Sequence, residues 1–133
     1  MEFDKKFYEK EFKKFLGDKE TKNYIRKSNE TFKINHFKKL AESSLLISKD
    51  IKSPHKEPDQ KYWLRWSITI NYYSMLYAAK SLILSKGYET GDHYATQIAL
   101  GYLCVPDEIE KEDLELLDQA HKIFEEKIYR KPK

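Results

Sequence analysis

The segment 60–86 constrains the fold more than any other part of this 133-residue chain. Large apolar side chains recur along it at steps of three and four residues, and a second apolar stripe lies beside the first. Small side chains occupy the remaining side and let another helix approach closely. These small residues are Ser67, Asn71, Ser74, Ala78, Ser81 and Ser85. Because every face of such a helix can be covered, we expect it to run through the middle of a bundle or to sit between two protomers.

Polar side chains within this segment argue against a membrane-spanning helix. Arg65, Lys80 and several hydroxyls interrupt it, and no window of the chain approaches twenty apolar residues free of charge. The first residues lack the apolar run of a secretory signal. Cys104 is the only cysteine, so the chain cannot form an internal disulfide. We therefore expect a cytoplasmic protein that does not contact a membrane.

The same periodicity predicts helices on both sides of this segment. We expect them at residues 3–16, 31–51, about 93–103 and about 107–129. Residues 17–30 are polar and broken, which indicates a loop or one short turn, and no stretch shows the alternation of a strand. The expected fold class is all-α: one domain over 1–133, folded as an antiparallel up-and-down bundle of about five helices with a buried central helix.

Charge is distributed unevenly along the chain, although the net charge is only +3. Residues 1–58 hold fifteen Lys and Arg against ten Asp and Glu, whereas 107–127 hold nine acids against three Lys. Such asymmetry can steer a polyanion or dock a partner chain, and solvated helix faces produce it as well. The net charge alone does not indicate nucleic-acid binding.

The order of residues in 71–93 resembles the HEPN superfamily, particularly its small prokaryotic members. Their hallmark looks like a Tyr-Tyr-x-Met-x-x-Ala-Ala core followed by Leu-Leu, Lys-Gly and a His that opens the next helix. This chain has Tyr-Tyr-Ser-Met-Leu-Tyr-Ala-Ala from Tyr72, Lys-Gly at 86–87 and then His93. Residues 37–48 and 125–129 are similar to the family's preceding and closing helices. The resemblance covers 32–129, and residues 1–30 look like an N-terminal helical extension added to a HEPN-like bundle at 31–130.

The resemblance implies an antiparallel helical bundle, a homodimer, and work on nucleotides or RNA beside a minimal nucleotidyltransferase in a toxin–antitoxin pair. Ribonuclease members of the family use an Arg followed four to six residues later by a His. None of Arg26, Arg65 and Arg130 has a His at that distance. Our first hypothesis is therefore a nucleotide- or RNA-associated module that lacks this nuclease motif. The alternatives are a metal-independent ribonuclease whose composite site lies at the dimer interface, and a non-catalytic structural adaptor.

Candidate catalytic residues lie near the end of the chain. His121, Glu125 and Tyr129 are spaced four residues apart and so share one stripe of the last helix, with Arg130 next to them. An imidazole beside a carboxylate can act as an acid–base pair. A charged, solvated helix face produces the same spacing by chance.

Candidate contacts to a ligand or to RNA lie elsewhere. His93 follows the helix cap Asp92, where main-chain N–H groups favour an anion, and it can equally just support the cap. Lys80 interrupts an apolar stripe, so its ammonium must snorkel, pair with an acid or line a cavity, and Arg65 faces a similar choice. Tyr72 can stack on a base or belong to the core.

The sequence predicts no metal site and no cofactor. The four histidines are scattered, and neither a Cys-His cluster nor a glycine-rich phosphate loop is present. A bound nucleotide would have to be held by cationic side chains or by helix termini.

Overall fold

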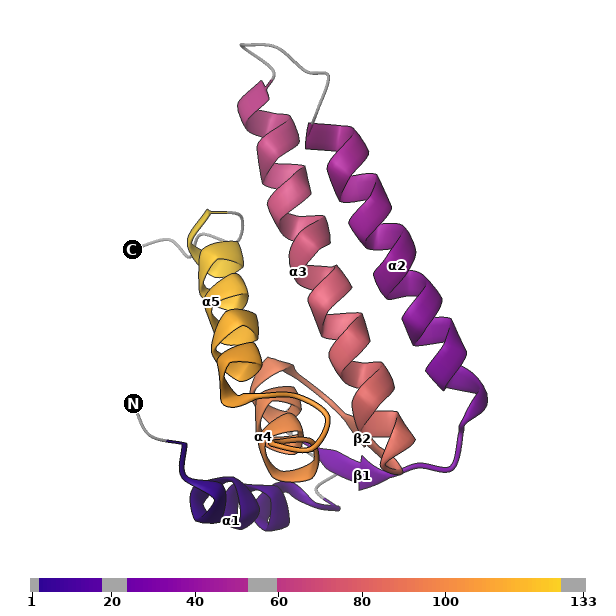
Figure 1. Cartoon of the computed structure of the whole chain (residues 1–133), viewed down its shortest axis with the longest axis vertical. Helices are drawn as coiled ribbons and strands as arrows, with labels where there is room; N and C mark the ends of the chain where they lie inside the picture. The colour runs from indigo at the N-terminus through magenta and orange to yellow at the C-terminus, as the bar shows by residue number, and fades with distance from the viewer. Residues whose placement is uncertain (1–2, 18–23, 53–59, 128–133) are drawn as a thin grey trace.

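The computed structural model describes residues 3–17, 24–52 and 60–127 of the chain. In them five helices pack together beside one small two-stranded sheet (Figure 1). The helices are α1 (Lys5–Phe15), α2 (Phe32–Lys52), α3 (Gln60–Ser85), α4 (His93–Leu103) and α5 (Lys111–Lys127). The strands are β1 (Ile25–Lys27) and β2 (Tyr88–Thr90). The prediction of a helical bundle with about five helices is confirmed, and the small sheet was not predicted.

The prediction of a loop over 17–30 was wrong where β1 forms. This strand pairs antiparallel with β2, with Ile25 opposite Thr90, and the side chain of Ile25 is fully buried. Main-chain hydrogen bonds extend this pairing at both ends, from Gly91 N to Tyr24 O (3.0 Å) and from Ser28 N to Gly87 O (2.8 Å). On its other side β1 is joined to the end of α1, where Gly17 N donates to Ile25 O at 2.7 Å. Strands of three residues are too short to show an alternating pattern, so the sequence carries little signal for them.

The last helix begins later than the predicted residue 107. The main-chain N–H groups of Glu108 and Ile109 donate back to the carbonyl of Cys104, which forms a turn there instead of a helix. The Asp113 carboxylate then accepts from Glu110 N at 2.9 Å, a reciprocal contact typical of a helix start. On α5, Leu114 and Phe124 face the core, while Leu116 and Ile123 are exposed.

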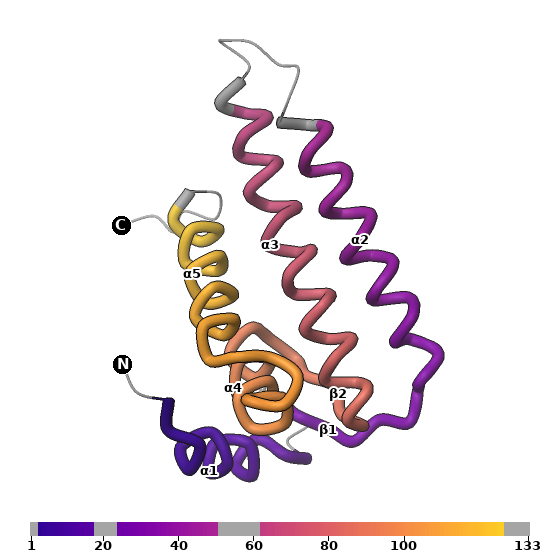
Figure 2. The backbone as a smooth tube through the Cα atoms, viewed as in Figure 1, coloured from indigo at the N-terminus to yellow at the C-terminus, as the bar shows by residue number. Residues whose placement is uncertain are grey.

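Buried serines join α2 and α3 into an antiparallel hairpin (Figure 2). The hydroxyls of Ser48 and Ser67 lie 2.9 Å apart. Two further serines of α3 donate to main-chain carbonyls of α2, Ser74 to Ala41 (2.6 Å) and Ser81 to Ile34 (3.2 Å). The predicted close approach along the small-residue face of this helix is confirmed at these three serines of α3.

Only the C-terminal half of α3 is buried in the way we expected. Ala79, Ile83 and Leu84 are buried, whereas Trp66 keeps 60% of its surface exposed. The reason lies in the arrangement: α1, α4 and the sheet gather around one end of the hairpin, and the other end extends past them (Figure 1). The expectation of complete coverage is therefore wrong for the single chain, and the alternative of a helix between two protomers stays a prediction.

The first helix packs against α4 and shares its core. Phe12 and Phe15 are buried in the main hydrophobic cluster. The ammonium of Lys5 donates to the carbonyls of Gly101 (2.8 Å), Tyr102 (2.6 Å) and Val105, which satisfies main-chain acceptors at the C-terminal end of α4. Nearby, the Tyr8 ring lies directly on Gly101, since a Cβ added to this glycine would come within 2.2 Å of the ring.

We expect Gly101→Ala to destabilise the protein. In an open helix the change would add about 1 kcal/mol of stability because alanine is the better helix former. Here the new methyl group would overlap the Tyr8 ring, and overpacking of this kind costs about 1–3 kcal/mol. Chemical denaturation measures the sign. In a Tyr8→Ala background the same change should be neutral or stabilising, and equal costs in both backgrounds would contradict the contact.

Candidate functional site

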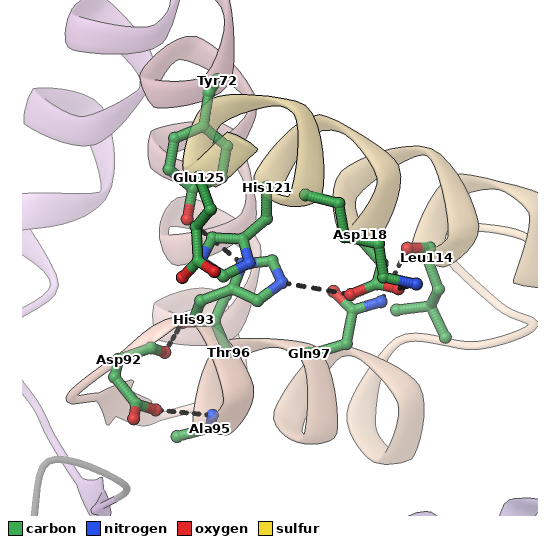
Figure 3. Close-up of polar contacts among 11 residues, drawn as sticks. Tyr72, Asp92, His93, Ala95, Thr96, Gln97, Leu114, Asp118, His121 and Glu125 are labelled. Atoms are coloured by element: carbon green, nitrogen blue, oxygen red, sulfur yellow. Dashed lines mark hydrogen bonds and ion pairs between the residues drawn. The ribbon is translucent and has the colours of Figure 1, made fainter. Parts of the chain in front are cut away.

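Four of the predicted site residues come together where α3, α4 and α5 meet. Tyr72 comes from α3, His93 from the first turn of α4, and His121 and Glu125 from α5 (Figure 3). They lie far apart in the sequence, and only the packing of the three helices brings them into contact.

The two imidazoles stack on each other. The rings of His93 and His121 have centroids 3.8 Å apart and planes inclined by only 7°. Asp92 fixes the position of the first ring by capping α4, where its carboxylate accepts from Ala95 N at 2.8 Å. The second ring is held from its own helix, because Glu125 Oε1 lies 3.2 Å from His121 Nε2 one turn away.

Tyr72 contacts the first imidazole from α3. Its hydroxyl lies 3.2 Å from His93 Nδ1, and its ring stacks on Phe124 at 5.0 Å. Burial raises the pKa of Tyr72 far above its usual value, so the phenol keeps its proton. The tautomer of the His93 ring decides which of the two groups donates the hydrogen bond.

Burial lowers the pKa of His93, and the neighbouring His121 lowers it further. Asp118 opposes both effects, since its Oδ1 lies 3.6 Å from His93 Nε2. This separation permits an electrostatic attraction but is too long for a hydrogen bond. Within the described part of the chain, the buried Nε2 atom therefore has no hydrogen-bond partner. His93 is neutral near pH 7, and a neutral ring does not repel a proton taken up by His121.

This geometry suits acid–base chemistry at His121. The nitrogens of His93 are engaged with Tyr72 or buried, whereas His121 is partly exposed and has a carboxylate at hydrogen-bonding distance. A partly exposed imidazole with an adjacent carboxylate can accept a proton and hold the resulting charge. The predicted pairing of His121 with Glu125 is confirmed as a contact.

Other predicted residues lie away from this cluster. The Lys80 ammonium donates to Thr90 O at 3.3 Å and lines a small cavity beside Glu89, and burial lowers its pKa. Arg65 lies at the exposed end of the hairpin, beside Trp66. The structure does not place these two cations at the histidine cluster. Tyr129 and Arg130 lie outside the described residues.

Sequence reasoning missed two members of the cluster, Asp118 and Gln97. Both lie one helical turn from a histidine, Asp118 three residues before His121 and Gln97 four residues after His93. Their spacing was therefore a usable signal. It could be recognised only once the two histidines were known to meet, because each residue alone resembles an ordinary polar position on a helix.

Residues 3–17, 24–52 and 60–127 contain no group of three or more His, Cys, Asp or Glu side chains arranged to hold a metal ion. None of the helices described there has the length and apolar character needed to cross a bilayer.

No protein-family model, curated protein or solved structure matches this chain. The resemblance to the HEPN superfamily therefore stays a prediction that rests on the residues of 32–129.

The pKa of His93 should respond in opposite directions to its two charged neighbours. His121→Ala removes an imidazole that disfavours the charged ring, so the pKa of His93 should rise. Asp118→Asn removes the attracting carboxylate, so it should fall. A proton-NMR titration of the imidazole resonances measures both shifts.

The same shift links folding stability to pH. The unfolded chain binds a proton at His93 near pH 6.5, while the folded site resists that proton. The free energy of unfolding should therefore fall as the pH drops through this value toward the lower folded-state pKa. Denaturation curves of His93→Gln should show a weaker fall, and an unchanged pH profile would contradict the assignment.

Proposed function

We propose that the protein is a HEPN-like, RNA-associated helical module that cleaves RNA without a metal ion, with His121 as the group that moves the proton. The observation that carries the proposal is the partly exposed His121 with Glu125 at 3.2 Å and a neutral His93 stacked beneath it. Of the hypotheses drawn from the sequence, the ribonuclease fits this arrangement best. A non-nucleolytic module and a structural adaptor give no role to the acid–base pair.

The proposed reaction uses the ribose of the RNA itself as the nucleophile. His121 accepts the proton of the 2′-hydroxyl while the 2′-oxygen attacks the neighbouring phosphorus. The bond from phosphorus to the 5′-oxygen of the next nucleotide breaks, and that oxygen receives the proton from His121. The products are a 2′,3′-cyclic phosphate and a free 5′-hydroxyl. Between the two transfers Glu125 stabilises the imidazolium, and the neutral His93 keeps the ring oriented.

An RNA cleavage assay in the presence of a metal chelator tests this proposal. His121→Ala should lower the rate of cleavage by about 10²- to 10⁴-fold, the usual contribution of a positioned acid or base. Glu125→Gln should lower it less, because the imidazole remains. His36→Ala, which alters an exposed histidine on α2, is the matched control and should leave the rate unchanged.

Two outcomes would refute the ribonuclease proposal. The first is an absence of cleavage by the wild-type chain, and the second is cleavage that survives His121→Ala. In either case a module or adaptor would be favoured, above all if a second protein co-purifies with the chain. The resemblance points to a nucleotidyltransferase-type partner in a toxin–antitoxin-like system, and this partner remains part of the proposal.

We also propose that the module is a homodimer that joins through the projecting end of the α2–α3 hairpin. Large apolar side chains of both helices are exposed there: Leu45, Leu46, Ile47, Tyr62, Trp63 and Trp66. Apolar patches of this kind mark protein–protein contacts. Over residues 42–50 and 62–73 two acids, Glu42 and Asp50, balance two bases, Lys49 and Arg65. A neutral apolar surface suits a second copy of itself better than a polyanion.

Trp66→Glu should convert the dimer into a monomer, because it places a charge in the middle of the apolar surface. Leu116→Glu is the matched control, since Leu116 is similarly exposed, at 55%, but lies on α5. Analytical ultracentrifugation of the two variants and the wild-type chain measures the mass. A monomeric wild-type chain would refute the dimer, and a dimer that persists in Trp66→Glu would refute this surface.

A further inference from the structure

A second concave site lies next to the histidine cluster, between α1, α4 and α5. Its volume is about 370 Å³, within the range of pockets that hold small ligands. Aromatic residues of α1 and its entry segment form one wall, and polar residues of α4 and α5 form the other. The pocket is lined by, among others, Phe3, Phe7, Tyr8, Gln97, Glu115 and Asp118. Asp118 belongs to both sites, because it also lies 3.6 Å from His93.

The aromatic wall is preorganised for a flat ligand. The rings of Phe3 and Tyr8 stack with centroids 4.8 Å apart, and Phe7 meets Tyr8 edge-on at 5.6 Å. Tyr8 is held from behind by its contact with Gly101. Phe7 keeps 44% of its surface exposed, so part of this aromatic cluster is open to a second ring.

The opposite wall offers hydrogen-bond acceptors. Gln97 Nε2 donates to the carbonyl of Leu114 at 2.6 Å, and because a carbonyl only accepts, the orientation of the amide is settled. Gln97 Oε1 is then a buried acceptor that has no hydrogen-bond partner among the described residues. Leaving such an atom unsatisfied costs free energy, which a ligand donor would recover.

The charges around the pocket also favour a ligand that donates hydrogen bonds. The carboxylates of Asp4, Glu115 and Asp118 line it together with the ammonium of Lys111, and a second ammonium, that of Lys122, lies 3.1 Å from Asp118 Oδ2. Burial raises the pKa of Tyr8, and the negative charges of Asp118 and Glu115 raise it further. An excess of negative charge disfavours a phosphate inside the pocket and favours a group that donates N–H bonds.

We infer that this pocket binds a nucleobase with an amino group at C6 of a purine or C4 of a pyrimidine, that is adenine or cytosine, as a base subsite beside the proton-transfer site. This inference rests on the proposed action on RNA. The base stacks on the aromatic wall, its amino group donates to Gln97 Oε1 and Asp118, and its ribose and phosphate lie outside the pocket toward His121. Uracil and hypoxanthine carry a carbonyl oxygen where cytosine and adenine carry the amine, so the acceptor-rich wall rejects them.

Nucleosides test the inference without the phosphate. The full chain, labelled with nitrogen-15, is titrated with adenosine and with inosine, which differ mainly in this amine. Adenosine should shift the main-chain amides around Phe7 and the side-chain amide of Gln97, and it should bind about tenfold more tightly than inosine, the usual effect of one lost hydrogen bond. Phe7→Ala should weaken adenosine binding. The control Leu116→Ala, at an exposed position outside the pocket lining, should not.

The outcomes separate this inference from the ribonuclease proposal. Equal binding of the two nucleosides, or shifts confined to other parts of the chain, would overturn the base subsite. RNA cleavage without any preference for adenosine or cytidine over uridine would overturn the base subsite alone. Selective binding of adenosine by a chain that does not cleave RNA would support the subsite and refute the ribonuclease.

Discussion

The close contact of α3 with α2 is the constraint on which the rest of the structure depends. Two helices approach this closely only when the side chains between them are small, and here buried serines fill that position. They also use their hydroxyls, so that Ser74 and Ser81 donate to main-chain carbonyls of α2. The seam aligns α3 against a long partner and thereby sets where Tyr72, on another side of the same helix, meets α4 and α5.

Periodicity predicted the helices because it reports which side of a helix is buried, and that information is local. It predicted the small-residue face of α3 and the stripe that pairs His121 with Glu125 for the same reason. The strand Ile25–Lys27 could not be predicted, since its pairing partner lies more than sixty residues away and neither strand is long enough to alternate. The prediction that α3 is covered along its whole length was wrong at its exposed end. An apolar helix face indicates that the face is buried, but it does not indicate whether the same chain or another chain buries it.

In the candidate site, too, the sequence predicted local features but not the contacts between helices. Each histidine was a reasonable candidate alone, yet their stacking at 3.8 Å depends on the angle at which α4 meets α5, which no local pattern encodes. Asp118 and Gln97 became visible only through that meeting. The resulting environment explains why two chemically identical side chains differ in role. His93 is the more deeply buried of the two and is held neutral by its surroundings, while His121 is more open and lies beside a carboxylate.

The hydrogen bonds from Lys5 to the end of α4 limit how far the chain can be shortened from its first residues. Helix α4 has only eleven residues, and its two ends are closed by Asp92 on one side and by an ammonium from the start of the chain on the other. A fragment that begins at residue 31 lacks Lys5, so the C-terminal end of α4 would be exposed to water and free to fray. That end lies about three turns from His93. Removing residues 1–30 would therefore loosen the helix on which the stacking of His93 and His121 depends.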